Sequence, residues 1–228
     1  MRKEPFTVGN YVHVYNRGNR KMPIVHDDHD RWRFLKILRY FNDDYSPENI
    51  FRMVDQTFQR PSDWPTPKPL VKILSFCLMP NHFHLLLKEI IDGGITKFMM
   101  KLGTGLTNFL NTKYHESGRV FQGPYKARTI KDDQYLQYLD VYIHVLNPLE
   151  LYPGGLEKAL TQFDEALEFA VNYSFCGLPD VLRKRSLSII DRDILKDWFS
   201  SLKAYKEFAY EAAVVKNTKE MLGKLAID

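Results

Sequence analysis

At the centre of this chain stands the stretch Leu78-Met79-Pro80-Asn81-His82-Phe83-His84-Leu85-Leu86-Leu87. Successive side chains of a β-strand point to opposite faces, so His82 and His84 share one face and Phe83 lies on the other. Pro80-Asn81 is typical of a turn, which predicts a hairpin just before His82. Two imidazoles on one face are a candidate pair of metal ligands. A His-x-His pair is also common among ordinary surface and core histidines, so the rest of the chain must decide between these interpretations.

Length and composition indicate a globular protein. The chain has 228 residues, which suits one domain with an extension, and its hydrophobic content of 44% and charged content of 26% are ordinary. No apolar run approaches the ~20 residues that span a bilayer, and the first residues lack the apolar core of a signal peptide. With only Cys77 and Cys176, no disulfide framework is indicated, so we expect a cytoplasmic protein.

The charge is distributed unevenly. The net charge is only +4, yet residues 97–131 contain seven basic residues and a single acid, Glu116. Phenylalanines and tyrosines are interleaved with these cations. Cations for phosphates and rings for bases compose a surface that binds single-stranded nucleic acid. The alternative is an ordinary solvated helix face.

Hydrophobic periodicity predicts the elements of the fold. Residues 6–16, 71–78 and 82–88 alternate as strands, and 119–130 is extended. Helices are expected after Asp27, Asp28 or Asp30, over 96–114, and after Asp132 or Asp133, the last ending at Asn147-Pro148. This order predicts an α+β fold, a ferredoxin-like split βαβ sheet with the last helix lying across it.

Two further segments complete the expected organisation. Residues 42–69 are irregular and proline-rich, with a possible short helix near 48–58, and are interpreted as an inserted surface loop. Pro153-Gly154-Gly155 marks a joint. We therefore expect a catalytic domain at 1–152 and a helical extension at 153–228.

Four stretches in this order resemble the single-tyrosine HUH transposases of bacteria, in their REP-associated tyrosine transposase branch. They are Val14-Tyr15-Asn16-Arg17-Gly18, Met79-Pro80-Asn81-His82-Phe83-His84-Leu85-Leu86, Val120-Phe121-Gln122-Gly123-Pro124-Tyr125-Lys126-Ala127, and Tyr142-Ile143-His144 followed by Asn147-Pro148. The extension resembles that branch more loosely, through Tyr173-Ser174-Phe175 and residues 193–199.

The resemblance implies an activity and its parts. His82 and His84 would hold a divalent metal, Mg²⁺ or Mn²⁺, and Tyr142 would attack a phosphodiester in single-stranded or hairpin DNA, giving a 5′-phosphotyrosine. Tyr138 is the rival nucleophile, because Tyr135, Tyr138 and Tyr142 share one helix face. The basic extension favours a monomer, although relatives include dimers.

One feature departs from the family pattern. Its motif places Asn four residues after the tyrosine, as a third metal ligand, but here position i+4 is Leu146 and Asn147 follows. Either the chain leaves the helix before Pro148, or a π-bulge absorbs the extra residue and returns Asn147 to the metal. His144 should face away and be structural. The departure keeps open a catalytically weakened DNA-binding protein of the same fold.

Other functional assignments follow from the same motifs. A water-activating phosphohydrolase would need clustered carboxylates, which the spacing of Asp132, Asp133 and Asp140 does not offer. The candidate DNA contacts lie after the first strand and on the extended segment: Asn16, Arg17, Arg119, Gln122, Lys126 and Arg128. For Asn16, Arg17 and Gln122 a structural role in the turns is the alternative.

Overall fold

The structure is a computed structural model, which describes residues 5–48, 50, 58–193, 195, 198–199 and 201–217. Its centre is a four-stranded antiparallel sheet in the order β2-β3-β1-β4. The strands are β1 (Tyr11–Arg17), β2 (Val71–Met79), β3 (His82–Glu89) and β4 (Lys126–Ile130). This is the strand order of a split βαβ sheet, so the predicted α+β, ferredoxin-like fold is confirmed.

The hairpin at the heart of the sequence forms as predicted. Met79 pairs with His82 across the turn at Pro80-Asn81, and β3 then pairs with β1 on its other side. β2 contains an irregularity between Ile73 and Ser75, where one residue is inserted relative to β3. From Ser75 to Met79 the register is continuous, so Ser75, opposite Leu86, faces the same side of the sheet as His82 and His84.

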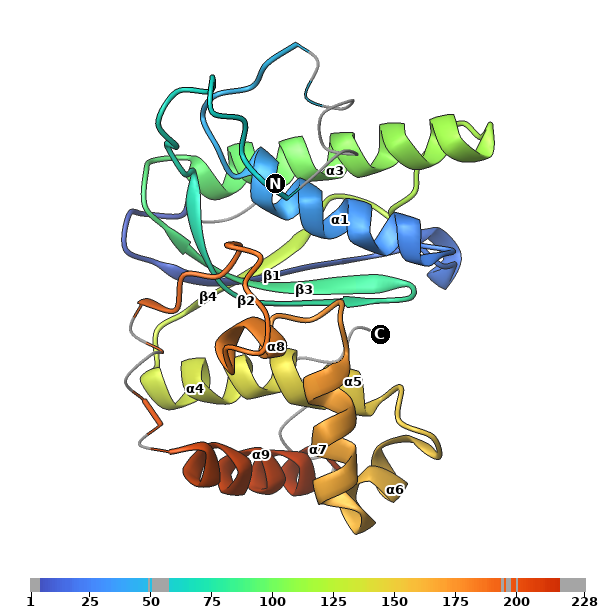
Figure 1. Ribbon diagram of the computed structural model, residues 1–228, viewed down its shortest axis with the longest axis vertical. Coiled ribbons are helices and arrows are strands. Elements are labelled where there is room, and N and C mark those ends of the chain that lie inside the picture. The colour runs from blue at the N-terminus through green and yellow to red at the C-terminus, as the bar shows by residue number, and fades with distance from the viewer. Residues whose placement is uncertain are drawn as a thin grey trace.

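Two helices cover one face of the sheet (Figure 1). Helix α1 (Asp28–Phe41) begins as expected, with the Asp27 carboxylate accepting a hydrogen bond from the Asp30 amide at 2.9 Å. Helix α3 (Gly94–Tyr114) crosses α1 closely at Gly105, where an added Cβ would lie 2.2 Å from the Phe41 ring. Phe83 of β3 is fully inside this apolar layer.

The opposite face is covered by a helix that changes its winding. α4 (Asp133–Val141) continues into a π-helical turn, η2 (Tyr142–Leu146), and then into α5 (Asn147–Leu149). The helix therefore continues through Asn147-Pro148 and ends at Leu149, one residue beyond the predicted end. The wide turn tolerates Pro148, since the Cys176 thiol approaches the carbonyl oxygens of His144 (3.4 Å) and Ile143 (3.9 Å), where the proline has no N–H to donate.

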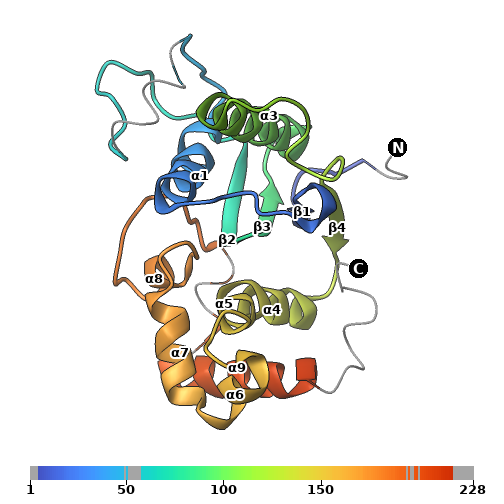
Figure 2. The ribbon, with the colours of Figure 1, turned by 90° about the vertical axis from the view of Figure 1, so that its right-hand side faces the viewer.

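The extension packs against this second layer and against the sheet edge (Figure 2). It contains α6 (Gly155–Thr161), α7 (Phe163–Asn172), α8 (Leu178–Val181) and α9 (Leu202–Asn217), which share one apolar core with α4 and the π turn. Its backbone also pairs with the edge strand β2, through Leu78 N–Phe175 O and Gly177 N–Phe76 O, both 2.9 Å. The expected boundary at 152/153 falls in the turn before α6 and stays a prediction.

The inserted loop is fastened at its base by the buried Asp43. Its carboxylate accepts hydrogen bonds from Arg60 (2.5 Å) and from the Tyr45 amide (3.0 Å). The short helix expected near 48–58 falls mostly outside the described residues. Cys77 and Cys176 are buried, free thiols. Within the described ranges, no helix is both long and apolar enough to cross a membrane.

Candidate active site

The two histidines of β3 lie on the face covered by α4 and the π turn. His84 is almost fully buried, and His82 is 8% exposed at the end of the hairpin. Phe83, between them, packs into the opposite core with Phe34. The alternation predicted from the sequence is thus confirmed, and it separates a polar face from an apolar one.

Each imidazole is fixed through its Nδ1 atom. His82 Nδ1 lies 2.7 Å from the Asn81 Oδ1 atom, and Asn81 in turn donates to the Lys21 carbonyl at 3.1 Å. His84 Nδ1 lies 2.9 Å from His13 Nε2. When each Nδ1 donates its proton, both Nε2 atoms keep a free lone pair. His84 Nε2 is buried without any hydrogen-bond partner.

His13 was not identified from the sequence as a site residue. It lies on β1, stacks on His84 with ring centroids 5.1 Å apart, and is 1% exposed. The available signal was the alternation of residues 11–15, which places His13 and Tyr15 on one strand face. Only the strand order reveals that this face is next to His84, because β1 and β3 are about 70 residues apart in sequence.

Burial keeps this histidine cluster neutral. It lowers the pKa of His82 to about 4 and, together with Arg128, the pKa of His13 to about 3. Burial also holds the pKa of His84 well below its usual range, with His13 and His82 adding to the effect. A neutral imidazole is the form that ligates a metal ion.

Tyr142 meets the histidines from the opposite layer. Its ring lies edge-on to His84, with centroids 5.5 Å apart. Tyr138 stacks on Tyr142 at 6.3 Å, and Tyr135 stacks on Tyr138 at 6.4 Å, so the three tyrosines form the predicted common face. Tyr142 is half-buried, whereas the Tyr138 hydroxyl is buried and has no hydrogen-bond partner.

The π turn absorbs the extra residue of the motif. The backbone N–H of Asn147 donates to the Tyr142 carbonyl, which is the i to i+5 bond of a π-helix. In such a turn residue i+5 returns to the side of residue i, so Asn147 shares the side of Tyr142. Its side chain is fully buried, and neither its oxygen nor its nitrogen has a hydrogen-bond partner. A buried amide side chain without a partner is unusual in a folded protein, because its desolvation is not compensated.

A charged pair borders Tyr142. Lys216, near the end of α9, lies with its ammonium 5.0 Å from the centre of the Tyr142 ring and 2.5 Å from a Glu150 oxygen. Burial, followed by the negative charge of Glu150, raises the pKa of Tyr142 well above its usual range. Neither charged residue was expected here, because no motif marks them and Lys216 is far away in sequence.

On the far side of the π turn, a buried network fixes the tyrosine helix. His144 Nδ1 lies 3.0 Å from the Asp140 carboxylate, which accepts hydrogen bonds from Ser75 (2.5 Å) and Arg192 (3.2 Å). Burial alone would raise the pKa of Asp140, but these partners lower it to about 2. His144 therefore has the structural position predicted for it.

The predicted DNA-contact residues divide between two places. Three of them lie on the face of the histidines: Arg17 pairs in register with His82, Lys126 lies 5.8 Å from the Tyr15 ring, and Arg128 lies 5.3 Å from the Tyr135 ring. The other three do not join this group: Asn16, Arg119 and Gln122.

Asn16 has a structural contact. It is buried, and its side-chain amide donates to the Gly123 carbonyl at 3.0 Å. Gln122 holds the same segment through its backbone, at 3.0 Å from the Arg17 carbonyl, while its side chain is exposed. Arg119 is exposed and borders a separate cavity of about 670 Å³ beside α3.

A second group of potential metal ligands lies elsewhere. Asp27, His29 and Asp30 at the start of α1 bring ligand atoms within 4.8 Å of one another, the one group of this kind among described His, Cys, Asp and Glu residues. However, the Lys113 ammonium already binds both carboxylates at 2.6 Å. This group is therefore better explained as an ion-pair cluster than as a metal site.

The match to protein families covers this centre. Residues 67–145 match the model of the family described as Transposase IS200 like, a stretch that runs from just before β2 into the π turn. It includes both histidines of β3 and Tyr142. The resemblance to tyrosine transposases predicted from the sequence is therefore confirmed.

A solved structure supports the same fold. The chain is similar to a REP-associated tyrosine transposase that was solved bound to a REP hairpin, with 11% identity and a TM-score of 0.50. The match covers 89% of this chain and 92% of that chain, so it includes the extension. A comparison with curated protein sequences gave no match.

Proposed function

We propose that the protein cleaves and rejoins single-stranded DNA beside a hairpin, through a covalent 5′-phosphotyrosine on Tyr142. The observation that carries this proposal is the π turn. It brings the unpaired Asn147 amide to the side of Tyr142, which contacts His84. In this proposal Tyr142 is the nucleophile, and His82, His84 and Asn147 are three uncharged side chains of types that bind metals.

The donor set fits a divalent metal. His82 and His84 would bind through Nε2 and Asn147 through its side-chain oxygen, leaving positions for a phosphate oxygen and water. Two imidazoles suit Mn²⁺ better than Mg²⁺, which prefers oxygen ligands. Such an ion would act as a Lewis acid on the non-bridging phosphate oxygens.

The protein's own residues perform the remaining steps. The Tyr142 oxygen forms a bond to phosphorus, the bond from phosphorus to the 3′-oxygen breaks, and the 3′-oxygen leaves as a hydroxyl after taking up a proton. The phenolic proton passes to water, which the high pKa of Tyr142 makes slow without a neighbouring cation. Reversal of these steps, with a 3′-hydroxyl as the attacking group, rejoins the strand and restores the phenol.

The charged surface supports DNA as the substrate. Arg17, Lys126 and Arg128 lie on the face of the histidines, with Tyr15 and Tyr135 rings beside them. Cations and rings on one surface suit the phosphates and bases of a single strand. A hairpin as the second recognition element is suggested by the structural relative solved with a REP hairpin. A monomer remains the expected state.

Covalent trapping tests the proposal. The wild-type protein, mixed with Mn²⁺ and a hairpin oligonucleotide carrying a 5′ single-stranded flank, should give a protein–DNA adduct that survives denaturing electrophoresis. Tyr142→Phe should abolish the adduct while hairpin affinity stays unchanged. Tyr138→Phe is the matched control, one helical turn away, and should retain it. An adduct that persists in Tyr142→Phe, or that forms fully in excess chelator, would refute the assignment.

The second candidate is a hairpin-binding protein without cleavage activity. The shifted position of Asn147 is the feature that favours it, and the π turn is the observation that weighs against it. Binding of the oligonucleotide with no adduct in either metal would favour this second function.

A further inference from the structure

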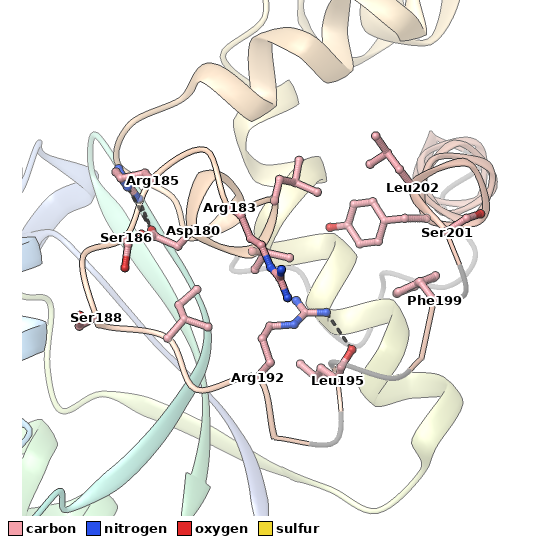
Figure 3. Close-up of a pocket in the computed structure, with 14 residues that line it drawn as sticks. Asp180, Arg183, Arg185, Ser186, Ser188, Arg192, Leu195, Phe199, Ser201 and Leu202 are labelled. Atoms are coloured by element: carbon pink, nitrogen blue, oxygen red, sulfur yellow. Dashed lines mark hydrogen bonds and ion pairs between the residues drawn. The ribbon is translucent and has the colours of Figure 1, made fainter.

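A pocket of about 380 Å³ lies in the extension, away from the histidines. It is bordered by the segment that follows α8 and by the start of α9, and Figure 3 shows arginine, serine and apolar side chains around it. The serines stand at positions 186, 188 and 201, and the apolar wall includes Ile190, Leu195 and Phe199.

The three arginines that line this pocket differ in how many hydrogen bonds and ion pairs their side chains form. Arg185 is fully engaged, with its guanidinium 2.5 Å from the Asp180 carboxylate and 2.7 Å from the Cys176 carbonyl. Arg192 donates to Asp140 at 3.2 Å and to the Leu195 carbonyl at 2.9 Å. The backbone N–H of Arg183 donates to the Asp180 carbonyl at 3.2 Å. Its exposed guanidinium, in contrast, forms no hydrogen bond or ion pair with the part of the chain that the structure describes.

Arg183 and Arg192 extend toward each other across the pocket (Figure 3). Two guanidinium groups that approach each other without an acid between them repel, unless an anion joins them. Arg183 also has a left-handed backbone conformation, with φ of 57°, which a non-glycine residue adopts at some cost. The local chain thus directs a positive charge to a place where none of the described residues supplies a partner.

Tyr205 provides an independent sign of a missing ligand. It lines the pocket from α9 and is 5% exposed, and its buried hydroxyl has no hydrogen-bond partner among the residues that the structure describes. Burial raises the pKa of Tyr205 well above its usual range, so the hydroxyl keeps its proton and is a donor. A buried donor beside two guanidinium groups is complementary to an anion with several acceptor oxygens.

We propose that this pocket binds the phosphate group of a nucleotide. Arg183 would offer its planar fork to two phosphate oxygens, and Tyr205 would donate to a third. The volume exceeds what one phosphate group needs, and the apolar wall with Phe199 gives a sugar or base a surface to contact. The nucleotide belongs either to a DNA strand or to a free molecule, and these two sources share the same phosphate chemistry.

The pocket is distinct from the catalytic face, but it is connected to the tyrosine helix. Arg192 reaches Asp140, which precedes Tyr142 by two residues and therefore points to the other side of the helix. A phosphate bound here does not contact Tyr142. The inference therefore does not depend on the proposed cleavage reaction.

Calorimetric titration of the full chain with thymidine 5′-monophosphate tests the proposal. The wild type should bind, Arg183→Met should weaken binding about tenfold, and Arg183→Lys should recover only part of it, because lysine lacks the fork. Tyr205→Phe should also weaken binding, with thermal stability unchanged or higher, since an unpaired buried hydroxyl is removed. Lys184→Met is the matched control, since Lys184 is exposed and not part of the pocket.

Two outcomes would overturn the proposal: no binding of the nucleotide by the wild type, or an equal loss in Lys184→Met and Arg183→Met. A single-stranded oligonucleotide identifies the source of the phosphate. If a DNA strand occupies the pocket, Arg183→Met should reduce the slope of log affinity against log salt by about 0.7. If a free nucleotide occupies it, the slope should stay unchanged while monophosphate binding is lost.

Discussion

On the face toward α1 and α3, strand β3 presents Phe83, whereas on the face toward α4 the same strand presents His82 and His84. The first face is filled by close-packed apolar side chains. The second carries buried polar atoms without partners, on His13, His84, Tyr135, Tyr138 and Asn147. Glu89 Oε1 is a further such atom, on the face of Phe83. Unpaired buried polar groups reduce stability, so a face that carries several of them is better suited to binding than to folding.

The largest expected effect belongs to the apolar face. Phe83 is 1% exposed and packs against the Phe34 and Phe121 rings. Phe83→Ala should therefore lower the free energy of unfolding by about 3–5 kcal/mol, from the lost transfer energy and the cavity. Urea denaturation provides the measurement. His84→Leu is the comparison variant and should cost less stability, since the loss of the bond to His13 is offset by removing a buried Nε2 atom that has no partner among the described residues. An equal loss of unfolding free energy in the two variants would contradict the contrast between a face packed for stability and a face arranged for binding.

The second prediction concerns Asn147. Asn147→Leu should abolish measurable Mn²⁺ binding by calorimetry or electron paramagnetic resonance, because the proposed oxygen ligand is gone. The same change should raise the free energy of unfolding of the metal-free protein by about 1 kcal/mol, because a buried amide without partners is removed. If Asn147 is a metal ligand, the metal-free variant should be more stable than the metal-free wild type. A large loss of stability would instead show that Asn147 is a structural residue.

The third prediction concerns His13. His13→Phe removes the acceptor at His84 Nδ1 while keeping a ring against His84. Loss of such a supporting hydrogen bond to a metal ligand typically weakens metal affinity 10–100-fold. The expected Mn²⁺ affinity of His13→Gln lies closer to wild type, since glutamine again offers an acceptor. If both variants bind Mn²⁺ like the wild type, His13 has a packing role only.

Much of the fold followed from local patterns in the sequence. Strand alternation, the turn at Pro80-Asn81 and the helix starts near Asp27 and Asp132 each depend on a few neighbouring residues and could be predicted. The structure selects Asp27 and Asp132 from the capping residues that the sequence left open. The pairing of the extension with the edge strand could not be predicted in this way. It depends on backbone hydrogen bonds between residues about 100 positions apart, which leave no periodic trace.

The candidate site divides in the same manner. His82, His84 and Tyr142 could be proposed from the sequence because motif and spacing are local. The choice between a broken helix and a π turn at Asn147 was left open, since one inserted residue is compatible with both. It was decided by the tertiary partner Cys176, whose thiol approaches the carbonyl oxygens beside Pro148. His13, Glu150 and Lys216 were missed because each joins the site only after distant segments have packed.

The smallest expected effect belongs to Lys216, near the end of α9, where this helix meets Tyr142 of the π turn. Its ammonium lies 5.0 Å from the centre of the Tyr142 ring, and in the proposed reaction it would stabilise negative charge on the phenolic oxygen during attack. Lys216→Met should therefore lower the rate of adduct formation by about three- to tenfold, and Lys216→Arg should recover most of it. Lys206→Met is the matched control, since Lys206 lies on the same helix but pairs with Asp164.

The measurement that separates catalysis from packing is the pH dependence of that rate. If Lys216 acts on the phenol, the rate of Lys216→Met should rise toward wild type as the pH increases and a larger fraction of Tyr142 is ionised. If Lys216 only fastens α9 to Glu150, Lys216→Met and Glu150→Gln should lower the melting temperature alike and leave the rate profile unshifted. An unshifted pH profile would mean that Lys216 has only a structural role, and that the proposed catalytic residues come from the sheet and the tyrosine helix alone.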